Sequence, residues 1–242
     1  MPKYYKMITE ETTLNTRSGP DVVFPASFRR QSASIVSTCS FIQCLLQHVI
    51  YVTHGAELRA AKRTLSDFPS PKSRIDFLCS FPYSEADPVF SAVFEYARLL
   101  FRDLYEIRNI LSHEVWAMSD AHGNAVIFSS LEEEARRLMV TGRIWHADDA
   151  NTKEIFDGMI RYIRNVKLVD SADLKAAMVD ADLCSWILMN ISNVLQEQDT
   201  ARREEARRLF LQFHGTAHLF GGGPSTSGTL AFSASRRKDI KG

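Results

Sequence analysis

Hydrophobic residues recur at helical spacing through most of this chain. The clearest stripe follows Asp87-Pro88, where apolar side chains lie three and four residues apart. Its members are Phe90, Val93, Ala97, Leu100, Leu104, Ile107 and Leu111. The stripe predicts one long amphipathic helix with a single face turned toward the core.

Similar patterns predict further helices on both sides of this one. The expected ranges are about 32–54, 56–65, 73–79, 152–166 and 172–213. Gly55 is a suitable stop for the first of them, and Ser73 is a suitable cap for the third. We therefore expect a mainly α fold built as a helical bundle, with its domain spanning residues 31–214.

The pattern changes immediately after residue 113. Val115 to Met118 and Ala125 to Phe128 are short apolar runs, and the residues between them include Gly123-Asn124. This arrangement predicts a β-hairpin, and Gly142 to His146 predicts a third strand. We therefore expect a small β insertion at about 114–147 within the helical domain.

The two ends of the chain differ from the helical part. Residues 1–30 contain Thr12-Thr13 and Ser18-Gly19-Pro20, with Val22 to Phe24 as their one apolar patch. We expect a flexible arm with at most one short strand and no export signal. Residues 215–242 contain a glycine- and serine-rich run from Gly221 and a basic end at Arg236, which predicts a disordered tail. The glycine run lacks the Lys-Ser/Thr of a phosphate-binding loop.

Composition limits the classes of partner. The 242 residues are 45% hydrophobic, which is enough to bury a core in a soluble globular protein. The 29 basic residues balance 29 acidic ones. Any site for a polyanion must therefore be a local cluster. The four cysteines form no Cys-x-x-Cys pair, and we interpret them as reduced, buried side chains of a cytoplasmic protein. The apolar segment 35–52 carries Ser, Thr, Gln and His, which favours a buried helix over a membrane span.

A row of polar residues lies beside the apolar stripe of the long helix. Its members, three or four residues apart, are Arg98, Arg102, Tyr105, Asn109 and His113. The helix ends in Arg108-Asn109-Ile110-Leu111-Ser112-His113, which brings a fixed cation, an amide and an imidazole together. RNA cleavage without a metal requires a base for the 2'-hydroxyl, an acid for the leaving group and positive charge for the phosphate.

We therefore divide the row into two groups of candidate residues. Arg108, Asn109 and His113 are the candidate catalytic residues. Arg98 and Arg102, together with Tyr105, are the candidate substrate-binding residues. No metal or other cofactor is expected at either group.

A mostly helical chain whose long helix ends in Arg-Asn-x-x-x-His resembles the HEPN superfamily and its bacterial ribonucleases and toxins. The signature is Arg, a polar residue such as Asn, and His after four to six intervening positions, which Arg108, Asn109 and His113 match. The resemblance covers the motif and its helix, and the flanking helices are compatible with it. The arm, the hairpin region and the tail fall outside it.

The resemblance implies a metal-independent endoribonuclease acting on RNA as a defence or stress toxin. Its site would form where two copies pair their motif helices in a homodimer, and an antitoxin or other regulatory protein would restrain it. One branch of the family carries a Tyr two residues after the motif His, which a partner nucleotidyltransferase modifies. This chain has Val115 there. The alternative is a catalytically inactive HEPN-like module that binds protein or RNA.

Spacing alone is a weak signal, because the chain contains a second pair of the same kind. Arg208 and His214 have five residues between them, but those residues form an apolar helix end without the adjacent Asn. We interpret that pair as structural. The pair of Arg108 and His113 is distinguished by Asn109 and by the long helix on which it lies.

Two other sites compete with the motif. His122, His146, Asp148 and Asp149 could form a metal cluster, but they lack compact ligand spacing. Cys44 and His48 have the spacing of a thiol and its base on a helix, within an apolar run that favours buried packing instead. The motif remains the leading hypothesis.

Overall fold

The computed structural model describes residues 4–8, 16–18, 23–55, 57–81, 88–119, 125–132, 135, 166–197 and 199–212. The described helices are α1 (Ala26–Thr53), α2 (Leu58–Asp67), α3 (Pro71–Cys79), α5 (Pro88–His113), α8 (Ser171–Gln196) and α9 (Thr200–Gln212). The described strands are β1 (Lys6–Met7), β2 (Thr16–Ser18), β3 (Val115–Ser119), β4 (Val126–Ser129) and β5 (Lys167–Val169). The predicted mainly α fold is confirmed.

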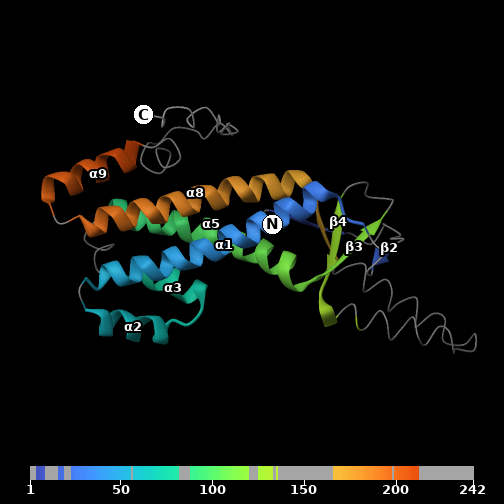
Figure 1. Ribbon diagram of the computed structural model, residues 1–242, viewed down its shortest axis with the longest axis horizontal. Coiled ribbons are helices and arrows are strands. Elements are labelled where there is room, and N and C mark those ends of the chain that lie inside the picture. The colour runs from blue at the N-terminus through green and yellow to red at the C-terminus, as the bar shows by residue number, and fades with distance from the viewer. Residues whose placement is uncertain are drawn as a thin grey trace, which may run out of the picture.

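The three longest described helices form a bundle, with α1 and α8 running in the same direction and α5 running against them (Figure 1). Hydrogen bonds join α1 and α8 near both ends: Ser171 Oγ donates to Gln31 Oε1 at 3.1 Å, and Gln196 Nε2 lies 2.9 Å from His48 Nε2. Helix α3 packs against α1 and α5. The sheet lies at one end of the bundle and α9 at the other (Figure 1).

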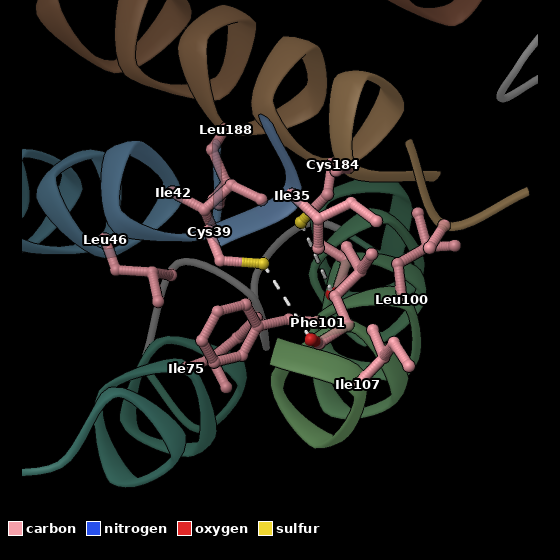
Figure 2. Close-up of a cluster of buried hydrophobic side chains, with 14 of the residues drawn as sticks. Ile35, Cys39, Ile42, Leu46, Ile75, Leu100, Phe101, Ile107, Cys184 and Leu188 are labelled. Carbon is pink, nitrogen blue, oxygen red and sulfur yellow. Dashed lines mark hydrogen bonds between the residues drawn. The ribbon is translucent and has the colours of Figure 1, made fainter. Parts of the chain in front are cut away.

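The core is built from side chains that α1, α3, α5 and α8 turn toward one another. Figure 2 shows members of this cluster, including Ile42, Ile75, Phe101 and Leu188. Burying such apolar groups stabilises the fold by about 25 cal/mol per Å² removed from water. The stripe predicted for α5 lies in this core, since its members from Val93 to Leu111 are buried.

The sheet is antiparallel, with strand order β1-β5-β4-β3-β2. The predicted hairpin is confirmed as β3 and β4, which pair Trp116 with Phe128. Strand β4 is buried on both faces: Phe128 packs into the main core, while Ile127 belongs to a second, smaller cluster. The sheet therefore fastens the segment after α5 to the helical bundle.

The N-terminal arm differs from the prediction. Part of residues 1–30 lies in the sheet as β1, which pairs with β5, and as β2, which pairs with β3. The two strands are two and three residues long, too short to show a period in the sequence. Strand β5 was also not predicted. The strand expected at 142–146 and the tail at 215–242 lie outside the described residues, as does most of the helix expected at 152–166.

Several helix boundaries also differ from the prediction. Helix α1 begins at Ala26 rather than near 32, although Gly55 ends it as predicted, with a positive φ of 58°. Helix α3 begins after Ser70, whose hydroxyl oxygen accepts from the Ser73 N–H, so Ser73 is not the cap. The long run predicted over 172–213 is two helices, and Asp199 Oδ1 caps the second by accepting from Arg202 N at 2.9 Å.

The prediction that the cysteines are buried holds for some of them. Cys39 and Cys184 are buried in the core, Cys79 is half-buried and Cys44 is exposed, so the prediction is wrong for Cys44. Helix α1 is long and apolar enough to cross a membrane by length and composition, with a mean hydropathy of 1.5 over its best window. The core helix of a soluble protein passes the same test, and α1 contributes nine buried residues to the fold.

Candidate active site at the end of helix α5

The C-terminal end of α5 is held in place by the strand that follows it. The last carbonyls of a helix lack partners within the helix. Here the Trp116 indole N–H donates to the carbonyl of Leu111 at 3.3 Å, and Glu114 N–H donates to the carbonyl of Ile110 at 3.2 Å. The Trp116 ring also packs edge to face against Phe28, with centroids 5.6 Å apart. The motif therefore lies on a fixed helix end.

The structure brings the three candidate catalytic residues together. Arg108 Nη1 donates to Asn109 Oδ1 at 3.0 Å and lies 3.1 Å from His113 Nε2. Arg108 and Asn109 are half-buried, while Ser112 and His113 are exposed. One guanidinium nitrogen thus contacts both other members of the motif, on a surface that solvent reaches.

The contact between Arg108 and His113 sets a condition on the imidazole. A guanidinium can only donate hydrogen bonds, so a hydrogen bond at this contact requires His113 Nε2 to accept through its lone pair. The tautomer that can do so carries its proton on Nδ1. The nitrogen that could remove a proton from a substrate is therefore the one that Arg108 contacts.

Part of the Arg108 guanidinium is buried. Its Nε is buried and has no hydrogen-bond partner among the described residues. The guanidinium lies near enough to Cys39 on α1 that its charge partly opposes the effect of burial, which raises the pKa of that thiol to about 12. Arg108 contacts Asn109 Oδ1 and His113 Nε2 here, and no carboxylate among the described residues pairs with it.

A second cluster of polar side chains lies near the end of α5 and was not predicted from the sequence. Lys167 on β5 pairs with Glu114, and its Nζ lies 5.8 Å from the centre of the Tyr5 ring. The Tyr5 hydroxyl donates to Glu106 Oε1 at 2.6 Å. Burial and this hydrogen bond raise the pKa of Tyr5, so the hydroxyl remains a donor. These contacts join elements that are distant in the chain, and no spacing indicates them.

The candidate substrate-binding residues lie at a separate place on α5. Arg98, Arg102 and Tyr105 line a cavity of about 60 Å³ between α3 and α5. The other lining residues are Lys72, Ile75, Asp76 and Phe101. The motif residues are not among them. The sequence placed the first three on one face correctly, but it gave no signal for the α3 residues, because the packing of α3 on α5 is a tertiary contact.

Two of these basic residues already have acidic partners. Arg98 pairs with Glu95 through two hydrogen bonds, one of them 2.8 Å long, and lies 3.7 Å from Asp76. The hydrogen bond with Arg98 lowers the pKa of Glu95. Arg102 Nε donates to Asp103 Oδ1 at 3.0 Å. The spacing of Glu95 and Arg98 on the helix is a signal that could have predicted the first pair.

The competing sites have little support in the described part of the chain. No three His, Cys, Asp or Glu side chains gather there as they would around a metal ion, and residues 122, 146, 148 and 149 lie outside it. His48 is hydrogen-bonded to Gln196 rather than directed at Cys44. Arg208 pairs with Glu205 at 2.7 Å, as expected for a structural residue, and His214 lies outside the described residues.

The fold and the motif define a mainly α protein with a polar cluster at the end of its motif helix. Comparisons with family models, with curated proteins and with solved structures found no match to this chain.

Proposed function

We propose that this protein is a metal-independent endoribonuclease of the HEPN type, with Arg108, Asn109 and His113 as its catalytic residues. The observation that carries the proposal is the pair of contacts made by Arg108 Nη1, to Asn109 Oδ1 and to His113 Nε2. The resemblance of the motif to the HEPN signature supports it independently. RNA is the proposed substrate.

The contact between Arg108 and His113 couples phosphate binding to activation of the base. A scissile phosphate offers Arg108 a stronger acceptor than a neutral imidazole does, because a guanidinium bonds a phosphate with two parallel hydrogen bonds. When Arg108 turns to the phosphate, the Nε2 lone pair of His113 becomes free. The imidazole is then ready to act as a base only when substrate is present.

The reaction follows from these groups. His113 Nε2 takes the proton of the 2'-hydroxyl, and the 2'-oxygen forms a bond to phosphorus. The bond from phosphorus to the 5'-oxygen breaks, and an acid protonates the departing oxygen. Arg108 stabilises the charge that builds on the phosphate, and Asn109 holds the guanidinium. The products are a 2',3'-cyclic phosphate and a 5'-hydroxyl.

The acid in this scheme is the imidazolium of a second copy. A single site has one motif histidine, which accepts a proton in the first step. A homodimer that pairs the ends of two α5 helices would supply both groups and two arginines. The exposure of Ser112 and His113 is compatible with such pairing. A defence or stress toxin of this kind would also need a regulatory partner, such as an antitoxin.

The test is incubation of the full chain with RNA in the presence of EDTA. Wild type is expected to produce fragments with 2',3'-cyclic phosphate ends. His113→Ala should reduce the rate about 10²- to 10⁴-fold, the usual contribution of a general base. The matched control is His48→Ala, on the exposed surface of α1, which should cleave as wild type does.

Two results would overturn the proposal: absence of cleavage by wild type, or equal cleavage by wild type and His113→Ala. Adding an excess of His113→Ala to a fixed amount of wild type, at saturating RNA, tests the dimer, because mixed dimers would hold only one of the two histidines that the scheme requires. A fall in cleavage supports a shared site, and unchanged cleavage would mean that each copy acts alone.

The second candidate function is a helical module that binds partners without catalysis. The zero net charge of the chain favours it, and so does the pairing of Arg98 and Arg102 with carboxylates. Such a module would bind without producing cyclic phosphate ends. The same cleavage assay therefore separates the two functions.

A further inference from the structure

We propose that the cavity between α3 and α5 receives the base of a nucleotide that lies within a few positions of the scissile phosphate, with the Tyr105 ring as its stacking surface. This subsite rests on the proposed function and deepens it. It adds Lys72 from α3 and Phe101 from α5 to the residues that receive RNA. It also separates the contacts that hold a base from those that perform the chemistry.

The first observation is the shape and lining of the cavity. Ile75 and Phe101 are almost completely buried and form an apolar floor, while Tyr105 is half-buried. The Phe101 and Tyr105 rings lie 5.7 Å apart with 31° between their planes. At about 60 Å³ the cavity is far smaller than the roughly 300 Å³ of a small-molecule pocket, so a base would lie at its mouth against the Tyr105 ring and would not be enclosed by it.

The second observation is the distribution of charge at the rim. Arg98 lines the cavity, but its charge is neutralised by Glu95 and Asp76 and is not free to bind a phosphate. Lys72 is exposed and makes no ion pair within the described part of the chain. Arg102 has a side chain that is 63% exposed and uses one nitrogen on Asp103. Lys72 and Arg102 can therefore contact a sugar-phosphate backbone at the mouth of an apolar cavity.

The third observation is the distance from the motif. A helix rises about 1.5 Å per residue, so Tyr105 precedes Arg108 by about 4.5 Å and His113 by about 12 Å along the axis. Stacked nucleotides rise about 3.4 Å each. A base on Tyr105 is thus separated from a phosphate at the motif by a few nucleotides at most. The half-buried ring, the apolar floor and the flanking cations are the features that recur where single strands are bound.

The experiment measures binding of a fluorescently labelled oligonucleotide by anisotropy. The probe is a hexanucleotide with 2'-deoxy sugars, which cannot be cleaved through a 2'-hydroxyl. We compare the intact probe with probes that carry one abasic residue at each position in turn. Loss of one particular base is expected to weaken binding about tenfold, and loss of the others is expected to have little effect.

Variants then assign that position to the cavity. Tyr105→Ala should weaken binding of the intact probe about tenfold and should abolish the difference between intact and abasic probes. Tyr105→Phe keeps the ring and should bind as wild type does. Lys72→Ala should weaken binding a few-fold, whereas Lys175→Ala, a matched exposed lysine on α8, should not.

Equal affinity of wild type and Tyr105→Ala would overturn the subsite, and so would an effect of Tyr105→Ala that persists unchanged on the abasic probe. The proposed function fails differently, by absence of RNA cleavage. Binding of the uncleavable probe can still reveal the subsite in that case. A protein that cleaves RNA but shows no position-dependent base effect would retain the function and lose the subsite.

Discussion

Two arginines on the same helix have opposite surroundings. Arg98, near the middle of α5, is held by the carboxylates of Glu95 and Asp76. Arg108, three turns further on, contacts the amide oxygen of Asn109 and Nε2 of His113. Arg98 is thus paired with acids, whereas Arg108 pairs with no carboxylate in the described part of the chain.

This difference separates a structural cation from one that can bind an anion. A guanidinium already paired with two carboxylates gains little from a phosphate, because it must first give up its partners. Arg108 would exchange weaker contacts for stronger ones. The acid nearest in sequence, Glu106, accepts a hydrogen bond from the Tyr5 hydroxyl. Glu114, just after the motif, is held by Lys167. Among the residues that the structure describes, the guanidinium at the end of α5 therefore has no carboxylate partner, in a chain whose net charge is zero.

Removing the charge at Arg108 gives the largest expected effect. Arg108→Ala should lower kcat for RNA cleavage about 10²- to 10³-fold, the usual result of losing a group that stabilises transition-state charge. Arg108→Lys keeps the charge but loses the planar fork, so it should recover only part of the rate. The measurement is single-turnover cleavage of a labelled RNA.

Arg208→Ala is the control for this comparison, since Arg208 is exposed and paired with Glu205 in the manner of Arg98. It should cleave as wild type does. An equal loss in Arg108→Ala and Arg208→Ala would contradict the distinction between the two kinds of arginine. Thermal unfolding of each variant identifies any loss of cleavage activity that comes from misfolding.

Removing Lys167, the partner of Glu114, should lower the free energy of unfolding. Lys167 and Glu114 have side chains that are 24% and 14% exposed, and Glu114 Oε2 accepts no hydrogen bond within the described part of the chain. Lys167→Met would leave a nearly buried carboxylate without its partner, and we expect the free energy of unfolding to fall by about 2 kcal/mol. Urea denaturation measures this change in the free energy of unfolding.

The matched change is Arg208→Met, which removes the basic member of an exposed pair. Its effect should stay within about 0.5 kcal/mol. If both variants lost the same stability, Lys167 would have no special role at the end of α5. A free Glu114 is also expected to approach Arg108 and slow cleavage, which the RNA assay can detect.

The structure also shows which helices and strands could be predicted from the sequence. The stripe from Val93 to Leu111 predicted α5, and the runs on either side of Gly123-Asn124 predicted the hairpin, because each has a local period. Strands β1 and β5 were missed because their pairing of Lys6 with Leu168 depends on contact between distant segments. Local pattern predicted the elements, and long-range pairing required the structure.

The same division applies to the candidate site. Helical spacing placed Asn109 and His113 on one face with Tyr105, and the structure adds that Arg108 reaches both motif partners. Spacing could not show that Arg98 and Tyr105 share a cavity with Lys72, because that depends on how α3 packs. It also could not show that Lys167 holds Glu114.

The smallest expected effect comes from weakening the pair at Arg98. Glu95→Gln removes one negative charge and leaves Arg98 with Asp76 as its carboxylate partner, so RNA should bind up to about fivefold more tightly at low salt. The gain should fade as salt is raised, because exposed charges are screened over about 8 Å at 0.15 M ionic strength. Glu205→Gln makes the same change in net charge far from the cavity and should leave affinity unchanged. If Glu205→Gln strengthened binding equally, the gain would come from net charge, and the pairing of Arg98 would not explain why the middle of α5 differs from its end.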